Sequence, residues 1–485
     1  MTPFRVWAER ALVGGLAPIA VYGSRFASNI ILSRLLAPDE FGTAVAISVV
    51  LGVGGLATDV ALDRFVIIDG SSRALSTAHL LAALNGIFLA GVLVLAAPLT
   101  AKLFGVPNFT ESFAIAAGIS AVGAFAHLGV KQVQRNYNYG PDTVAQVTAN
   151  VLGILGLLVA ATAFHNHRAI IVGMGLQSVT YVLLSHVLAP SSYRIRCDKE
   201  TLFRALLFGL PLMLNGIGLA AMSQLDRVLV GSWFGVKELG LYAVIISMAV
   251  VPASLINGIF SGPSLSFLLS NGQETSARAE RYQLLLTFYS LLTGLYACWM
   301  VLTLDILIPL IFGPSFTIST SAHVLLVLIA CLRLQRSGAP TSLLLASGRT
   351  KQLALLNLSA GFGLLVAAAC LAVWPSLEAM LIGIAIGELT SFTVFFTTLG
   401  KAVTRGRHVV ADLVRVIAVP AVMAAALAWK PYPTSDTRGM LLLIGMLAVL
   451  AQLSLELYRN SRFRTVVARS SIGRGLQGYF AATEK

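Results

Sequence analysis

Apolar stretches follow one another along nearly the whole chain, separated by short polar or charged segments. Each is close to, or longer than, the roughly 20 residues that an α-helix needs to cross a bilayer. A helix satisfies its own backbone hydrogen bonds, which lipid cannot do. The pattern therefore predicts an all-α integral membrane protein with about 14 transmembrane helices. The predicted spans are 12–36, 41–68, 80–100, 112–130, 142–164, 169–189, 205–234, 239–268, 283–311, 318–337, 351–373, 377–400, 411–429 and 439–457.

Composition agrees with this prediction and excludes several classes of protein. Hydrophobic residues make up 57% of the chain and charged residues only 11%, which rules out an ordinary water-soluble enzyme. The four cysteines show neither CxxC nor Cys/His spacing, so we expect no disulfide framework and no metal site. The 43 glycines are typical of transmembrane helices that pack closely or bend.

The net charge of +13 follows the membrane topology and gives no sign of nucleic-acid binding. If both termini lie on one side, that side collects 26 of the 34 Lys and Arg residues. Cytoplasmic loops carry such an excess of basic residues. We therefore expect both termini in the cytoplasm, including a basic tail at residues 458–485 that could contact membrane lipids.

An internal repeat appears when the chain is laid on itself with an offset of about 200 residues. The turn at 37–42 then matches 235–240, and Phe104-Gly105 matches Phe312-Gly313. Residues 157–161 match 364–368 without a change, and Asn150 meets Asn357. Two parallel six-helix lobes imply a pseudo-two-fold axis along the membrane normal and a substrate cavity between the lobes, which is transporter architecture.

The repeat divides the chain into four predicted parts. The N-terminal lobe covers residues 1–200 and the C-terminal lobe 201–400, each with six helices. Two extra helices occupy 401–457, and the basic cytoplasmic tail follows at 458–485.

Several motifs resemble one known family. Ser33-Arg-Leu-Leu-Ala-Pro-Asp-Glu-Phe-Gly-Thr43 and Leu225-Asp-Arg-Val-Leu-Val-Gly231 resemble the openings of the two lobes in the polysaccharide-transport (oligosaccharide/O-antigen flippase) branch of the multidrug/oligosaccharidyl-lipid/polysaccharide exporter superfamily. Val133-Gln-Arg-Asn-Tyr137 is similar to the motif after its fourth helix. One departure is Val60, where the family has Gly after the residue corresponding to Asp59.

The resemblance implies a flippase of the bacterial cytoplasmic (inner) membrane and not an enzyme. Its substrate would be an undecaprenyl-pyrophosphate-linked oligosaccharide, moved from the cytoplasmic to the periplasmic leaflet for exopolysaccharide, capsule or lipopolysaccharide O-antigen. We expect no cofactor beyond coupling to H+ or Na+. A polysaccharide polymerase and glycosyltransferases are candidate partners.

Arginines are the candidate substrate-binding residues, because a guanidinium binds phosphate through a planar fork of donors. Arg25 lies near the middle of the first apolar stretch, where a charge is costly and usually faces a cavity or an ion-pair partner. Arg227 follows Asp226 on the seventh predicted helix. Arg135 could hold a headgroup phosphate at the inner leaflet, although positive-inside anchoring explains it with no function at all.

Three acids are candidates for ion coupling or gating. Glu388 lies at the centre of an apolar stretch, where burial would favour a neutral, proton-carrying carboxyl group or one that bridges helices. Asp226 could contact the other lobe, form a gate or be solvated at the outer boundary. Asp59 approaches the cytoplasmic end of its helix, so a gate salt bridge competes with simple solvation. His127 and His323 each stand alone in apolar stretches, which is typical of packed histidines.

Three other functions compete with this hypothesis. A membrane-embedded glycan polymerase or ligase would need a large outer loop with catalytic residues, and the outer loops here are short. A cation-coupled multidrug exporter of the same superfamily would share both lobes, but Arg25 is a poor match for cationic drugs. A lipid II flippase would differ only in the glycan, and the sequence does not separate it.

Overall fold

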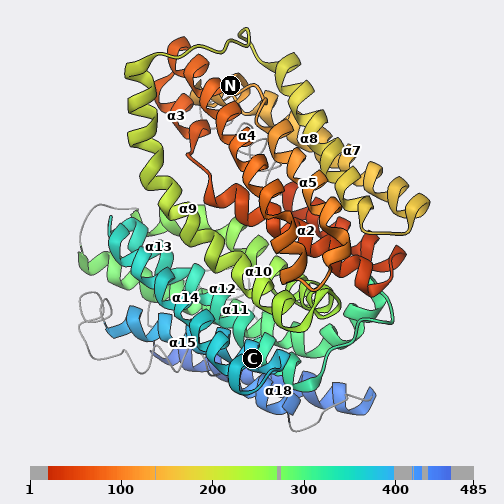
Figure 1. Cartoon of the computed structure of the whole chain (residues 1–485). Coiled ribbons are helices and arrows are strands. Elements are labelled where there is room, and N and C mark those ends of the chain that lie inside the picture. The colour runs from red at the N-terminus through yellow and green to blue at the C-terminus, as the bar shows by residue number, and fades with distance from the viewer. Residues whose placement is uncertain are drawn as a thin grey trace, which may run out of the picture. The chain divides into compact units, whose positions relative to one another are not determined.

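The computed structural model describes residues 20–136, 138–269, 275–397, 418, 420–428 and 435–459. These residues form helices joined by short turns, with no strand among them (Figure 1). The all-α prediction is confirmed. The basic tail after Arg459 and the N-terminal arginines Arg5 and Arg10 lie outside the described residues.

The contacts divide the chain into two compact units. Unit 1 comprises Met1–Ser247 with Pro309–Thr317, and unit 2 comprises Met248–Ile308 with Ile318–Lys485. The helices α10 (Val236–Leu269) and α11 (Thr275–Phe312) contribute to both units. This division follows contacts, not internal repeats, so the lobe boundaries at 200, 400 and 457 remain predictions.

Unit 1 begins with a helix over residues 20–35. The elements that follow it are α2 (Pro38–Ala57), α3 (Leu62–Asp69), α4 (Ser72–Leu103), η1 (Pro107–Phe109), α5 (Thr110–Gly123), α6 (Gly129–Gln132), η2 (Val133–Asn136), α7 (Gly140–Phe164), α8 (Arg168–Leu188) and α9 (Lys199–Phe234). Unit 2 contains α12 (Thr320–Ser337), α13 (Ala339–Ala346), α14 (Thr350–Val373), α15 (Leu377–Phe395) and α18 (Ser435–Arg459).

Ten helical spans among the described residues are long and apolar enough to cross a membrane. The number is lower than the predicted 14 for two reasons. The predicted span 112–130 forms only the 14-residue α5, because the chain leaves the helix after Gly123. The predicted spans 12–36 and 411–429 are described only in part, and the apolar part of α18 covers only Met440–Ser454.

The predicted helix at 41–68 is broken. Ala61 has a left-handed backbone (φ 51°), and the Asp59 carboxylate accepts a hydrogen bond of 2.8 Å from its N–H. This local bond gives the backbone an alternative to the helical ladder. The chain therefore turns between α2 and α3, and Asp59 is a residue of that turn.

The two turns that the repeat aligned contact each other within unit 1. A Cβ atom on Gly42 would lie 1.8 Å from the Val236 carbonyl oxygen, and one on Gly240 would lie 3.3 Å from the Gly42 backbone. Only glycine allows two backbones to approach this closely. The matched turns therefore begin α2 and α10 at a shared contact of small residues.

Small residues also join the helix pairs that the third repeat match identified. The helix α7 packs along α8, where a Cβ on Gly173 would lie 3.1 Å from the Gly153 carbonyl oxygen (Figure 1). The helix α14 packs along α15, where a Cβ on Gly363 would lie 2.7 Å from the Gly387 Cα. Lipid supplies no hydrophobic driving force between helices, so close packing of this kind holds such pairs together.

A histidine cluster holds the segment between α8 and α9, residues 189–198. His79 accepts a hydrogen bond from the Leu128 N–H and donates one to the Arg194 carbonyl, both of 3.1 Å. His127 accepts from the Gly129 N–H (3.0 Å) and donates to the Ser191 carbonyl (2.9 Å). Each ring therefore uses one nitrogen as an acceptor, which requires the neutral imidazole. His323 is likewise packed, with its ring 3.0 Å from the Met300 carbonyl. Both histidines singled out from the sequence are thus buried and hydrogen-bonded.

Acidic pH is expected to loosen the 189–198 segment. Burial lowers the pKa of His127, which lies in the turn between α5 and α6, and the rings of His79 and His186 next to it oppose a further positive charge. The stabilisation is complete above the unfolded pKa of about 6.5 and is lost as the pH falls below it. Hydrogen exchange at 189–198, corrected for intrinsic rates, should rise at pH 5.5 relative to pH 7.5. Equal protection at both values would contradict this role.

Candidate functional site

Glu388 lies between two arginines in unit 2. Its carboxylate is 2% exposed and accepts hydrogen bonds from the Nε atoms of Arg333 (2.9 Å) and Arg336 (2.8 Å). Arg336 also donates from Nη1 to the Asn357 Oδ1 at 2.8 Å. The cluster therefore joins α12, α14 and α15. Two adjacent guanidiniums favour the ionised carboxylate over the neutral form considered from the sequence.

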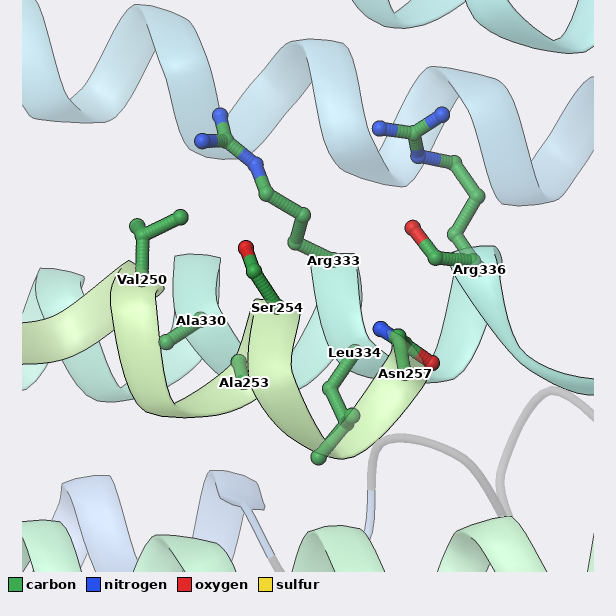
Figure 2. Close-up of a pocket in the computed structure, with 9 residues that line it drawn as sticks. Val250, Ala253, Ser254, Asn257, Ala330, Arg333, Leu334 and Arg336 are labelled. Atoms are coloured by element: carbon green, nitrogen blue, oxygen red, sulfur yellow. The ribbon is translucent and has the colours of Figure 1, made fainter. Parts of the chain in front are cut away.

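The partners of Glu388 could not be identified from the sequence, because Arg333 and Arg336 counted among the basic residues expected at the cytoplasmic side. Their spacing of three residues on an apolar helix is the signal that could have found them, since residues three apart share one helix face. The two arginine side chains, which extend from α12 in the same direction (Figure 2), differ in their exposure to solvent. The Arg333 side chain is 29% exposed and the Arg336 side chain 10%.

Arg25 and Arg227, two predicted substrate-binding residues, lie near enough in unit 1 for their charges to interact. Arg25 is on the helix at 20–35 and Arg227 is on α9, and their positive charges repel each other. Arg25 remains exposed although surrounding protein partly desolvates it. Neither guanidinium forms an ion pair with a carboxylate in the part of the chain that the structure describes.

The surroundings of Arg227 hold its side chain without neutralising it. Its Nη1 donates to the Gln224 Oε1 at 3.3 Å, and its Nε is buried with no hydrogen-bond partner. Gln224 in turn packs against Gly52 of α2, where a Cβ would lie 3.2 Å from its Nε2. A buried, unsatisfied donor on a charged group costs free energy unless a ligand supplies an acceptor.

Asp226 does not neutralise its neighbour Arg227. Its carboxylate accepts hydrogen bonds of 2.8 Å from the Tyr242 hydroxyl and from the Arg227 backbone N–H. The side chain is buried, with a relative exposure of 7%. Among the described residues it has no cationic partner within ion-pair distance. Asp226 is thus a buried acid with no cationic partner among the described residues, whereas Glu388 has two guanidiniums.

Arg135 and Asp59 both bond to nearby backbone groups. Arg135 donates from Nη1 to the carbonyl oxygens of Asp69 (3.0 Å) and Ile68 (3.5 Å), which end α3. A cation at a helix C-terminus satisfies its last carbonyls and complements its dipole. Asp59 binds the backbone of its own turn. The structure therefore gives both side chains a local structural contact, and their predicted roles remain untested.

The repeated asparagines both bridge helices. Asn150 accepts hydrogen bonds from the Ser24 hydroxyl (2.6 Å) and from Gln177 of α8 (3.0 Å). Asn357 accepts from Arg336 of α12. Ser24 directly precedes Arg25, so the Asn150 contact helps to position the start of the described first helix beside α7. No group of three or more His, Cys, Asp or Glu in the described segments could hold a metal ion.

Removing the Glu388 carboxylate should strongly destabilise unit 2, because two guanidiniums would lose their shared partner. Breaking one side of a buried ion pair costs about 3–5 kcal/mol. Glu388→Ala should therefore lower the melting temperature of the purified protein well below that of Glu378→Ala, which removes an acid bonded to serines at the other end of α15. Similar melting temperatures for the two variants would argue against this ion-pair cluster.

Comparisons with known proteins agree with the fold. The MATE multidrug transporter DinF-BH is similar at 14% sequence identity and a TM-score of 0.53, over 84% of this chain and 97% of that chain. A mutant of the Vibrio cholerae MATE transporter VcmN is similar at 14% identity and a TM-score of 0.49, over 83% of this chain and 97% of that chain. The first likeness shows a shared fold. No curated protein matches the sequence.

The sequence model of the family described as "Polysaccharide biosynthesis protein" matches residues 31–321. This range contains both motifs that open the predicted lobes, 33–43 and 225–231. The superfamily resemblance drawn from those motifs is confirmed. Because the match covers more than half of the sequence, the chain belongs to the polysaccharide biosynthesis protein family.

Proposed function

We propose that the protein is a flippase that moves an undecaprenyl-pyrophosphate-linked oligosaccharide from the cytoplasmic to the periplasmic leaflet. The observation that carries this proposal is the pair of guanidiniums at Arg25 and Arg227, which repel each other and have no carboxylate partner among the described residues. A pyrophosphate supplies the negative charge and the acceptor oxygens that both side chains lack. Membership in a polysaccharide biosynthesis family supports a glycan as the rest of the substrate.

Cationic side chains in membrane helices are costly. Two neighbouring cations without an anionic partner are therefore retained only where a ligand or water compensates their charge. A multidrug exporter for cations would gain nothing from this pair, because like charges repel the drug. This is the specific observation that ranks the flippase above that alternative. A polymerase or ligase of lipid-linked glycans would also use pyrophosphate contacts, but it needs catalytic groups that the sequence does not supply in a recognisable motif.

The proposal includes alternating access in the bacterial cytoplasmic membrane, with both termini in the cytoplasm, where the excess of Lys and Arg supports this orientation. Coupling to H+ or Na+ is assigned to Asp226, because it is buried and bonded to Tyr242 and has no guanidinium partner among the described residues. Glu388 is less suited to carry a proton while Arg333 and Arg336 stabilise its charge.

Arg25→Gln and Arg227→Gln should each reduce flipping at least tenfold, because each removes half of the charge offered to the pyrophosphate. Arg25→Lys should retain intermediate activity, since lysine keeps the charge but loses the fork of donors. The measurement is transfer of a lipid-linked oligosaccharide between leaflets in proteoliposomes.

Arg168→Gln is the matched control, because it removes one positive charge from an exposed pair with Glu111. It should flip at the wild-type rate. Wild-type protein that moves no lipid-linked sugar, or arginine variants as active as this control, would overturn the proposal.

A further inference from the structure

Exposed arginines gather in unit 1 where α3 ends and where α4 and α9 begin. Arg135 donates a hydrogen bond of 3.0 Å to the Asp69 carbonyl oxygen at the end of α3, and Arg204 of α9 pairs with the Asp69 carboxylate at 2.9 Å. The charges of Arg73, in the first turn of α4, and of Arg204 both act on the Asp198 carboxylate. This is the end of the unit that the excess of basic residues predicts to be cytoplasmic.

The segment 189–198 adds Arg194 and Arg196 to the same surface. Its backbone is bonded to α4, because the Arg196 N–H donates to the Ser76 carbonyl at 3.4 Å and the Arg194 carbonyl accepts from His79 at 3.1 Å. Both arginine side chains are exposed. The segment therefore holds two guanidiniums at the surface beside the first turns of α4.

The arginines that share this surface form a basic band, which consists of Arg73, Arg135, Arg194 and Arg196. None of the four forms an ion pair with a carboxylate in the described part of the chain. The Asp69 carboxylate is already paired with Arg204, so it does not neutralise the band. Guanidiniums that are exposed and lack such partners can bind an anionic ligand, and a phosphate fits their fork of donors.

Large apolar side chains are exposed beside these arginines. Ile195 lies between two arginines of the band and is 48% exposed. Ile68, whose carbonyl oxygen is 3.5 Å from the Arg135 Nη1, and Phe203, next to Arg204, are each 64% exposed. At a membrane surface, apolar side chains contact acyl chains while guanidiniums reach the headgroup phosphates. A soluble acidic protein or a nucleic acid would match the charge of this surface but not its apolar side chains.

We propose that the basic band is a binding site for an anionic phospholipid of the adjacent leaflet, with arginines at its phosphate and the exposed apolar side chains against its acyl chains. The bound lipid would hold the 189–198 segment against α4. This inference does not rest on the proposed flippase function. Its site also differs from the Arg25 and Arg227 pair that we assign to the pyrophosphate.

Native mass spectrometry of the purified full chain measures this lipid binding directly. The wild type should bind phosphatidylglycerol at least fivefold more tightly than phosphatidylcholine with the same acyl chains. The triple variant Arg73→Gln/Arg194→Gln/Arg196→Gln should lose at least fivefold in affinity for phosphatidylglycerol and keep its affinity for phosphatidylcholine. Arg135 is left unchanged because it also holds the end of α3.

Hydrogen exchange in nanodiscs gives a second measurement at the 189–198 segment. For the wild type, exchange there should be slower in phosphatidylglycerol than in phosphatidylcholine at pH 7.5. The triple variant should show the same exchange in both lipids. A difference between the lipids that persists in the triple variant would overturn the role of these arginines.

The matched control is Lys102→Gln/Arg168→Gln/Lys237→Gln, which removes the same charge from exposed positions of unit 1 outside the band. It should bind phosphatidylglycerol like the wild type. Equal binding of the two lipids by the wild type would overturn the site, and so would equal phosphatidylglycerol binding by the triple variant and this control. Undecaprenyl pyrophosphate should not displace phosphatidylglycerol from the wild type. Displacement would assign the band to the transported lipid and contradict a phospholipid site.

Discussion

The cost of a charge away from water is the constraint on which this structure depends. Glu388 meets two guanidiniums, and Asp142, buried near the start of α7, accepts hydrogen bonds from Lys131, Gln134, Gln146 and Tyr181. Such compensation is what burial of a carboxylate requires. Arg25 and Arg227, by contrast, have no carboxylate partner among the described residues, and the ligand that we propose would supply the missing negative charge.

Close approach of small residues is what allows these clusters to form. Hydrogen bonds between side chains on different helices need backbones that approach closely, which the glycines of α7, α8, α14 and α15 permit. Asn150 and Gln177 meet across one of these pairs, and Asn357 and Glu388 both reach Arg336 from the other. The repeat in the sequence is thus a repeat of helix packing that places polar groups at corresponding positions. The hydrogen-bond partners of these groups differ between the two units, because Asn150 bonds to Ser24 and Gln177, whereas Asn357 bonds to Arg336.

The fold class could be predicted from the sequence because the length of an apolar stretch is set by the bilayer and is visible in one dimension. The short length of α5 could not be predicted from the sequence. Its apolar run continues past Gly123, although the chain leaves the helix there and places His127 against the 189–198 segment. Among the candidate residues, Arg25 and Glu388 were recognisable as costly charges within apolar stretches. The partners of Glu388 were not recognisable, because a hydropathy pattern does not distinguish Arg333 and Arg336 from any basic residue near a helix end. The proximity of Arg25 to Arg227 depends on contacts between helices far apart in the sequence.

Arg25 and Arg227 are proposed to form a pyrophosphate site together. Its most direct test is the affinity of purified protein in nanodiscs for undecaprenyl pyrophosphate without a glycan, compared between wild type and the Arg25→Gln/Arg227→Gln double variant by native mass spectrometry. The wild type should bind undecaprenyl pyrophosphate and bind undecaprenol far more weakly, and the double variant should lose most of the binding to undecaprenyl pyrophosphate. Equal affinity of the two proteins for undecaprenyl pyrophosphate would contradict this site.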